Sequence, residues 1–203
     1  MLLQILNLVG IAAFAVSGAL VGVPNRLDIF GVAVVGTTTG IGGGLIRDIL
    51  LGIHPPTSMV EWPNVAVPVA MSLFVFFAHA QVDRVWRAVL LFDACGMGLF
   101  TATGAAVALD HGAGPLAAVM IGTTAAVGGG VLRDVLVNEV PLLLRRDLYA
   151  LPALLGAALV TLCIHLDLAT NLALIVGAVA ATTVRCLALW QRWNLPQATT
   201  TEP

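Results

Sequence analysis

Two arginine–aspartate pairs, Arg47-Asp48 and Arg133-Asp134, stand inside long apolar stretches of this 203-residue chain. Charges within apolar membrane segments are costly, and those that are retained usually face a bundle interior or a water-filled path. Neighbouring residues on a helix point about 100° apart. We therefore expect each arginine to bind partners on other helices or free carbonyl groups, not simply the adjacent aspartate. The alternative is that the arginines extend along the helix to the membrane surface.

Glycine triplets precede both pairs and could supply such carbonyl groups. They are Gly42, Gly43 and Gly44 before the first pair, and Gly128, Gly129 and Gly130 before the second. Each glycine inside a helix costs up to about 1 kcal/mol relative to alanine. A duplicated triplet beside charged residues predicts a discontinuous helix, whose freed backbone groups would have to line protein or a water-filled cavity. Close helix packing on small residues is the alternative.

Hydroxyl groups come one or two turns before the glycines, at Thr37, Thr38, Thr39, Thr123 and Thr124. Together with exposed carbonyls, they could replace part of the hydration shell of a cation. The alternative is a bond from each threonine to the carbonyl four residues earlier in its own helix. Ser17 and Thr103 could face the same cavity, and Asp93 is a further acid inside an apolar stretch. The candidate ion pathway thus comprises both triplets, both charged pairs, Thr38, Thr124, Ser17 and Asp93.

No arrangement typical of an enzyme is present, such as paired carboxylates, a metalloprotease helix motif, a nucleophile elbow or a phosphate-binding loop. All nine basic residues are arginines and form no basic patch, which excludes nucleic acid as a partner. Cys95, Cys163 and Cys186 lack metal-site spacing and lie in apolar runs, so we expect buried free thiols. We therefore predict no catalytic residue, no bound metal and no cofactor.

The candidate residues need apolar helices to hold them, and the composition predicts a membrane protein. Hydrophobic residues make up 59% of the chain and charged residues 10%, too few to cover a water-exposed surface. A membrane-spanning helix needs about 20 mainly apolar residues. Seven stretches qualify: Leu2–Val23, Ile29–Ile53, Trp62–Ala80, Ala88–Leu109, Gly114–Val137, Leu148–Leu166 and Leu168–Trp190. We predict an all-α polytopic membrane protein with seven transmembrane helices.

An internal repeat relates the two charged motifs. Residues 36–49 and 122–135 are identical at 8 of 14 positions, and the same offset places Asn7 opposite Asp93. Because each repeat holds three helices, the second copy must cross the membrane upside down. We predict one transmembrane domain over residues 1–190, with repeat one at 1–80, repeat two at 88–166 and an extra helix at 168–190. The polar tail at 194–203 is predicted to be disordered.

The arginines also predict the orientation in the membrane. With the N-terminus outside, the outer loops hold no arginine. The inner loops then hold six, namely Arg26, Arg84, Arg87, Arg145, Arg146 and Arg192. This bias predicts an outside N-terminus and a cytoplasmic C-terminus.

These motifs resemble the bacterial branch of the trimeric intracellular cation (TRIC) channels. The resemblance rests on GGGLIRD and GGGVLRD, each followed by a proline seven residues after its aspartate, and on the stretches FAVSGAL (14–20) and LRRDLYALPALLG (144–156). It implies a homotrimer in the bacterial inner membrane, in which each subunit holds a pore for monovalent cations, chiefly potassium. It also implies that the second and fifth spans, as broken helices, line that pore. The animal branch carries Lys-Glu where this chain has Arg133-Asp134, so its lipid and calcium regulation is not carried over.

The same bacterial domain is commonly labelled a glycine transporter, and both functions fit inverted repeats. The N-terminus of a half-helix attracts a carboxylate, whereas the carbonyls that end the preceding half attract a cation. That geometry suits a potassium ion or a zwitterionic amino acid. The acids Asp48, Asp93 and Asp134 favour a cation path, and the small chain leaves little room for large rocking domains. The sequence thus predicts a potassium channel, with a small amino acid (glycine) transporter as the alternative, ahead of a structural membrane protein.

Overall fold

Helices make up the regular structure in this computed structural model, which describes residues 1–79, 85–144 and 148–193. The elements are α1 (Leu2–Gly22), α2 (Ile29–Leu50), α3 (Thr57–Val60), α4 (Pro63–Ala78), α5 (Val85–Asp110), α6 (Pro115–Leu136), the short 3-10 helix η2 (Leu142–Leu144), α7 (Ala150–His165) and α8 (Thr170–Gln191). The predicted all-α class is confirmed for these residues. The loop arginines Arg84, Arg145 and Arg146 and the tail at 194–203 lie outside them.

Five helices, α1, α2, α5, α6 and α8, are long and apolar enough to cross a membrane. The apolar helices α4 and α7 have 16 residues each, which gives about 24 Å of helix against a hydrocarbon core of about 30 Å. The stretches predicted from the sequence are longer than both helices, because hydropathy does not distinguish apolar loop residues from helix residues. It also missed α3, which lies between α2 and α4. The count of seven spans stays a prediction.

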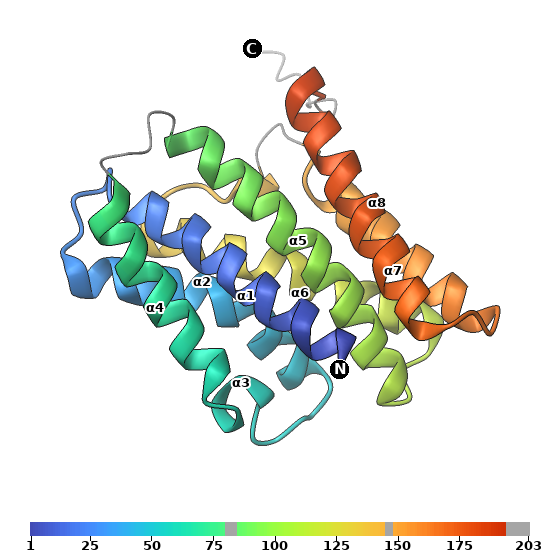
Figure 1. The fold of residues 1–203 in the computed structure, drawn as a ribbon. Coiled ribbons are helices and arrows are strands. Elements are labelled where there is room, and N and C mark those ends of the chain that lie inside the picture. The colour runs from blue at the N-terminus through green and yellow to red at the C-terminus, as the bar shows by residue number, and fades with distance from the viewer. Residues whose placement is uncertain (80–84, 145–147, 194–203) are drawn as a thin grey trace, which may run out of the picture.

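The helices pack as two groups of three that meet along their central members. Helix α1 packs on α2 and α4, and α5 packs on α6 and α7. The two groups meet where α1 lies on α5 and α2 lies on α6, while α8 packs on α5 and α7. Figure 1 shows α4 and the α7–α8 pair on opposite sides of these central helices. The motif-bearing helices α2 and α6 therefore lie together at the centre.

Two phenylalanines join the groups through a reciprocal contact. The buried rings of Phe14 and Phe100 meet edge to face, with centroids 5.4 Å apart. The Phe14 ring lies against Gly96, where an added Cβ would stand 2.7 Å from it, and the Phe100 ring lies against Gly10, where the distance would be 2.8 Å. Each ring thus fills the space that a glycine leaves in the other group.

The prediction that the glycine triplets break their helices is wrong. Both α2 and α6 continue through their triplets without interruption. A Cβ on Gly43 would strike the carbonyl oxygen of Ala125, and one on Gly129 would strike the carbonyl oxygen of Thr39. The glycines let the two backbones approach closely, which is the small-residue packing common in membranes. Contacts between the helices offset the cost of glycine within each helix.

Helices α2 and α6 end in similar turns, which direct the following loop back toward the end of each helix. After α2, Gly52 has a φ of 67° and Ile53 donates to the Asp48 carbonyl at 2.8 Å. After α6, Asn138 has a φ of 57°, and the amide of residue 139 donates to the Asp134 carbonyl at 2.8 Å. A left-handed residue with such a bond is a common helix ending. These turns bring the next loop against each aspartate.

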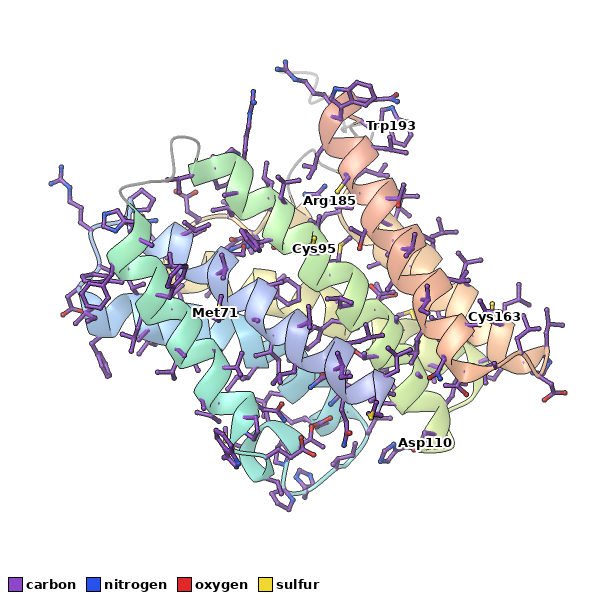
Figure 2. The ribbon with its side chains drawn as sticks, viewed as in Figure 1. Met71, Cys95, Asp110, Cys163, Arg185 and Trp193 are labelled. Atoms are coloured by element: carbon purple, nitrogen blue, oxygen red, sulfur yellow. The ribbon has the colours of Figure 1, made fainter. Side chains whose placement is uncertain are left out.

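The outer surface is apolar and carries a free thiol. Large apolar side chains are exposed on it, including Phe77 at 73% and Leu116 at 78%, as a lipid-facing surface requires. Cys95 on α5 is also exposed, whereas Cys163 and Cys186 are half-buried, and all three are free. Figure 2 labels Cys95 and Cys163. The expectation of buried thiols is therefore wrong for Cys95.

Candidate functional site

Each arginine–aspartate pair occupies the last turn of its helix and is buried there. Arg47 and Asp48 on α2 are 3% and 0% exposed, and Arg133 and Asp134 on α6 are 0% and 6% exposed. The arginines therefore do not extend to the surface of the chain. This rules out the alternative that they reach along the helix to the membrane surface. Buried charges of this kind must find partners within the protein.

In the first network, Arg47 binds its own neighbour. Its Nε donates to Asp48 Oδ1 at 2.8 Å, and Nη2 lies 2.7 Å from the same oxygen. The other carboxylate oxygen accepts from the Thr57 hydroxyl at 2.6 Å and the Thr57 amide at 2.8 Å. Arg47 therefore neutralises the adjacent aspartate, contrary to expectation, and its expected partner elsewhere is the Thr57 hydroxyl on α3, which accepts from Nη2 at 3.2 Å. Although the two Cβ atoms diverge, the arginine side chain is long enough to fold back.

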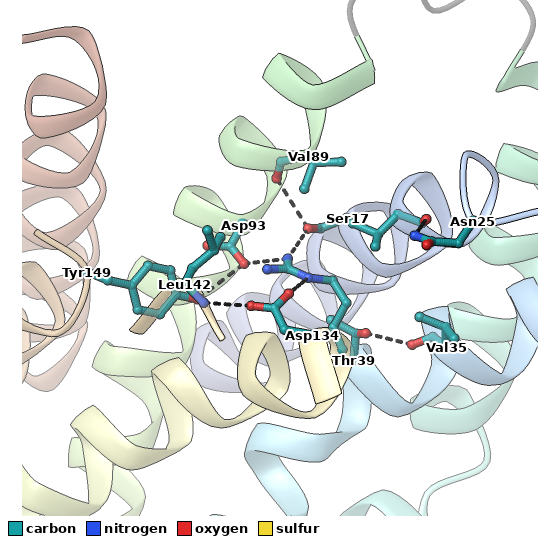
Figure 3. A network of polar contacts seen from close by, with 11 residues as sticks. Ser17, Asn25, Val35, Thr39, Val89, Asp93, Asp134, Leu142 and Tyr149 are labelled. Atoms are coloured by element: carbon teal, nitrogen blue, oxygen red, sulfur yellow. Dashed lines mark hydrogen bonds and ion pairs between the residues drawn. The ribbon is translucent and has the colours of Figure 1, made fainter. Parts of the chain in front are cut away.

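The second network joins three helices around Arg133. Its Nε donates to Asp134 Oδ1 at 2.8 Å, and its Nη1 donates to Asp93 Oδ1 at 2.7 Å and to the Ser17 hydroxyl at 2.6 Å. Asp134 also accepts from the Leu142 amide at 2.8 Å. Figure 3 shows Ser17, Asp93 and Asp134 converging from α1, α5 and α6. Here the expected partners on other helices are present, in addition to the neighbouring aspartate.

A tyrosine extends the second network toward α8. The Tyr149 hydroxyl donates to Asp93 Oδ1 at 3.2 Å. The guanidinium of Arg185 on α8 lies 4.7 Å from the centre of the Tyr149 ring and donates to the Leu148 carbonyl at 3.0 Å. Both Tyr149 and Arg185 are buried. A cation over an aromatic face stabilises both groups, so α8 helps to hold the tyrosine in place.

Sequence reasoning missed three of these residues. Arg185 stands inside the last apolar stretch and could have been found by the rule that singled out the other buried arginines. Tyr149 is the only tyrosine of the chain, and Thr57 follows two prolines. Neither of these two has a signal in the sequence that predicts its partner.

Most threonines follow the alternative of bonding within their own helix. Thr39, Thr123 and Thr124 each donate to the carbonyl four residues earlier, at 2.6 to 2.8 Å. Thr103 does the same at 3.0 Å, so it does not join Ser17, whose hydroxyl donates to the Val89 carbonyl and accepts from Arg133. Thr38 is half-buried. The buried hydroxyl of Thr37 has no partner among the described residues.

A cavity of about 460 Å³ opens beside the second network. Apolar side chains of α1, α5 and the α6–η2 connection form most of its wall, and Asp134 is part of its polar lining. Val89 and Leu142, which contact the network through their backbones, line it too. Within the described residues, no group of three His, Cys, Asp or Glu side chains could hold a metal ion. The site therefore pairs buried charges next to a partly open cavity.

Comparison with known sequences identifies membrane proteins. A family model described as glycine transporter matches residues 4–80 and 90–165. A UPF0126 membrane protein of Deinococcus radiodurans is 44% identical over 159 residues, which are 77% of this chain and 74% of the relative. The UPF0126 inner membrane protein YadS of Escherichia coli strain K12 is 37% identical over 202 residues, which are 96% of this chain and 94% of the relative.

Comparison with solved structures finds the same fold in cation channels. A TRIC trimeric intracellular cation channel orthologue from Rhodobacter sphaeroides has a TM-score of 0.91 at 38% identity, covering 94% of this chain and 98% of that chain. A second TRIC cation channel has a TM-score of 0.91 at 36% identity and full coverage of both chains. These matches confirm a polytopic membrane fold and the prediction that the chain is not an enzyme. The chain belongs to the bacterial branch of the TRIC channel family, whose sequence model carries the description glycine transporter.

Proposed function

We propose that this chain is a channel for monovalent cations, chiefly potassium, with one pore in each subunit of a homotrimer. The observation that carries the proposal is the likeness along nearly the whole chain to TRIC cation channels, at 36–38% identity and a TM-score of 0.91. The potassium ion would be the permeant species, and the channel would need no cofactor. The buried acids of both networks support a path for cations rather than anions.

The proposed pathway runs along α2 and α6, with one arginine network at each end. Both helices are continuous, so their carbonyls are not freed to coordinate an ion, and hydroxyls, acids and water would have to line the path. Where Gly43 lies against the Ala125 carbonyl, the two backbones leave no room between them. Conduction would require the helices to separate there. Arg47 and Arg133 would set the barrier, because their bonds tie each helix end to its surroundings.

A glycine carrier is the second candidate, because the matching family model bears that description. A carrier moves a fixed number of solutes per conformational cycle, whereas a channel passes ions continuously. Purified protein in a planar bilayer should give unitary potassium currents that reverse at the potassium equilibrium potential. Proteoliposomes should show no accumulation of labelled glycine beyond empty vesicles. Saturable glycine uptake without unitary currents would reject the channel in favour of the carrier.

We further propose an inner-membrane protein with seven spans, an outside N-terminus and a cytoplasmic C-terminus. The arginine bias supports this orientation, and relatives named as inner membrane proteins support the location. The family model also matches twice, which supports two repeats of opposite orientation. A reporter fused after Arg192 should be active only in its cytoplasmic format. Cross-linking in mild detergents should stop at a trimer.

A further inference from the structure

Asp93 holds a carboxylate oxygen that the second network does not use. Its Oδ1 accepts from Arg133 at 2.7 Å and from the Tyr149 hydroxyl at 3.2 Å. Its Oδ2 is buried and has no hydrogen-bond partner among the described residues. The whole residue is 0% exposed. A buried carboxylate oxygen without a partner is costly, so it calls for a ligand that binds there.

The two networks differ in their balance of charge at this point. In the first, Arg47 pairs with Asp48 alone, one positive group with one negative group. In the second, Arg133 is shared by Asp93 and Asp134. The offset between the repeats places Asn7, a neutral side chain, where the second repeat has Asp93. Among the described residues, the second network therefore holds one acid more than its arginine can neutralise.

Among the described residues, Arg133 is the one arginine that forms an ion pair with Asp93. Arg185 lies over the ring of Tyr149 and donates to the Leu148 carbonyl, and the tyrosine hydroxyl donates to Asp93. Gly130 on α6 also lies close to Asp93. A Cβ added to Gly130 would lie 3.3 Å from Asp93 Oδ1 and 2.5 Å from the Tyr149 hydroxyl. The cavity beside the network is lined by Val89, one turn before Asp93 on α5, and by Asp134.

We propose that Asp93 is a binding site for a monovalent cation, held by Oδ2 with water and neighbouring oxygens, and absent from the first network. This inference rests on the proposed channel function, and it makes the two ends of the pathway unequal. The missing charge is a single one, and the described residues offer no cluster of acids for a divalent ion. A monovalent ion satisfies both the free oxygen and the excess negative charge, whereas the Arg47 network needs neither.

The matched variants are Asp93→Asn and Asp110→Asn. The first keeps the shape of the side chain and removes its charge, as in Asn7; the second removes an exposed acid at the end of the same helix. Single-channel conductance would be measured against potassium chloride concentration. The half-saturating concentration should rise about tenfold or more in Asp93→Asn, as expected for loss of one attractive charge at a binding site. Asp110→Asn should match wild type.

Binding without conduction would be measured on the purified protein. Thermal unfolding would be followed in potassium chloride and in N-methyl-D-glucamine chloride at equal ionic strength. Wild type should be stabilised by potassium in a saturable way, and Asp93→Asn should lose this effect. Rubidium-soaked crystals of wild type should give an anomalous peak beside Asp93, which tests the site even if the variant does not fold.

The outcomes separate this inference from the proposed function. Unitary currents with an unchanged half-saturating concentration in Asp93→Asn, or rubidium density elsewhere but not at Asp93, would overturn the cation site and leave the channel intact. Stabilisation by low pH but not by potassium would also overturn it, since a proton would then neutralise the carboxylate. A rubidium peak at Asp93 in a protein that passes no current would support the site and reject the channel.

Discussion

Gly43 on α2 lies directly against the main-chain carbonyl oxygen of Ala125 on α6, with no space for a single methyl group between them. Its neighbour Gly44 is in a different position, because a Cβ there would make ordinary contacts, with the Phe100 ring at 3.6 Å and Arg47 Nη2 at 3.9 Å. The two glycines are neighbours in the same triplet of the same helix. Comparing alanine substitutions at the two positions therefore distinguishes the effect of packing between helices from the intrinsic cost of glycine within a helix.

Gly43→Ala should destabilise the protein and Gly44→Ala should not. Overpacking of a filled contact costs about 1–3 kcal/mol, whereas replacing an unconstrained helical glycine by alanine gains up to about 1 kcal/mol. Thermal unfolding of both variants in the same detergent gives the comparison. Equal unfolding temperatures for the two variants would contradict the close contact of α2 and α6.

Arg133→Ala should be more damaging than Arg47→Ala. The first change leaves two buried acids without their arginine, and breaking a buried charged pair costs about 3–5 kcal/mol. In the second, Asp48 keeps both donors from Thr57, so the loss should be smaller. Thermal unfolding, the yield of trimer and open probability would be measured for both. Arg87→Ala, an exposed arginine at the start of α5, is the control and should behave as wild type.

Thr57→Val should weaken the Arg47 network while leaving its ion pair intact. The hydroxyl donates to Asp48 at 2.6 Å and accepts from Arg47 at 3.2 Å, and valine keeps its shape without these bonds. Hydrogen bonds to charged groups are worth about 1.5–3 kcal/mol. We expect lower thermal stability together with a raised open probability. Unchanged gating would show that this network does not contribute to the barrier.

Tyr149→Phe should raise the open probability with a modest loss of stability. The change removes the bond from the hydroxyl to Asp93, worth about 1.5–3 kcal/mol at most, and keeps the aromatic ring beneath Arg185. Tyr149→Leu removes the ring as well, so the difference between the two variants measures the contribution of the contact with α8. If both variants gate as wild type does, the tyrosine only fills space.

Hydropathy and the repeat predicted where the charged motifs lie, because both signals are local along the chain. The apolar stretches corresponding to α1, α2, α5, α6 and α8 were each assigned to a span. The contact between Ser17 and Arg133 could not be predicted, since 116 positions separate the two residues. That Arg47 folds back onto Asp48 depends on the loop that brings Thr57 to the same carboxylate. The angle of about 100° between adjacent helical residues does not predict this contact.

The glycine triplets are a second case in which a contact between helices could not be predicted from the sequence. Their cost was counted within one helix, and a break was predicted from it. The compensating contact comes from the backbone of the other helix, at Ala125 and Thr39, and its presence depends on how the helices cross. Single-sequence reasoning named both outcomes and had no means to rank the packing above the break.

The reciprocal seating of Phe14 against Gly96 and Phe100 against Gly10 has a consequence for how such a chain could arise. Each half carries both a phenylalanine ring and a glycine that leaves space for such a ring. Each half is therefore complementary to a second copy of itself as well as to the other half. Such a self-complementary surface is what a twofold homodimer requires. As a separate polypeptide, either half would expose its phenylalanine ring and the unfilled space at its glycine. In a dimer of two antiparallel copies, the ring of each copy would fill the space at the glycine of the other. Gene fusion would then have preserved a dimer interface as the core of a single subunit.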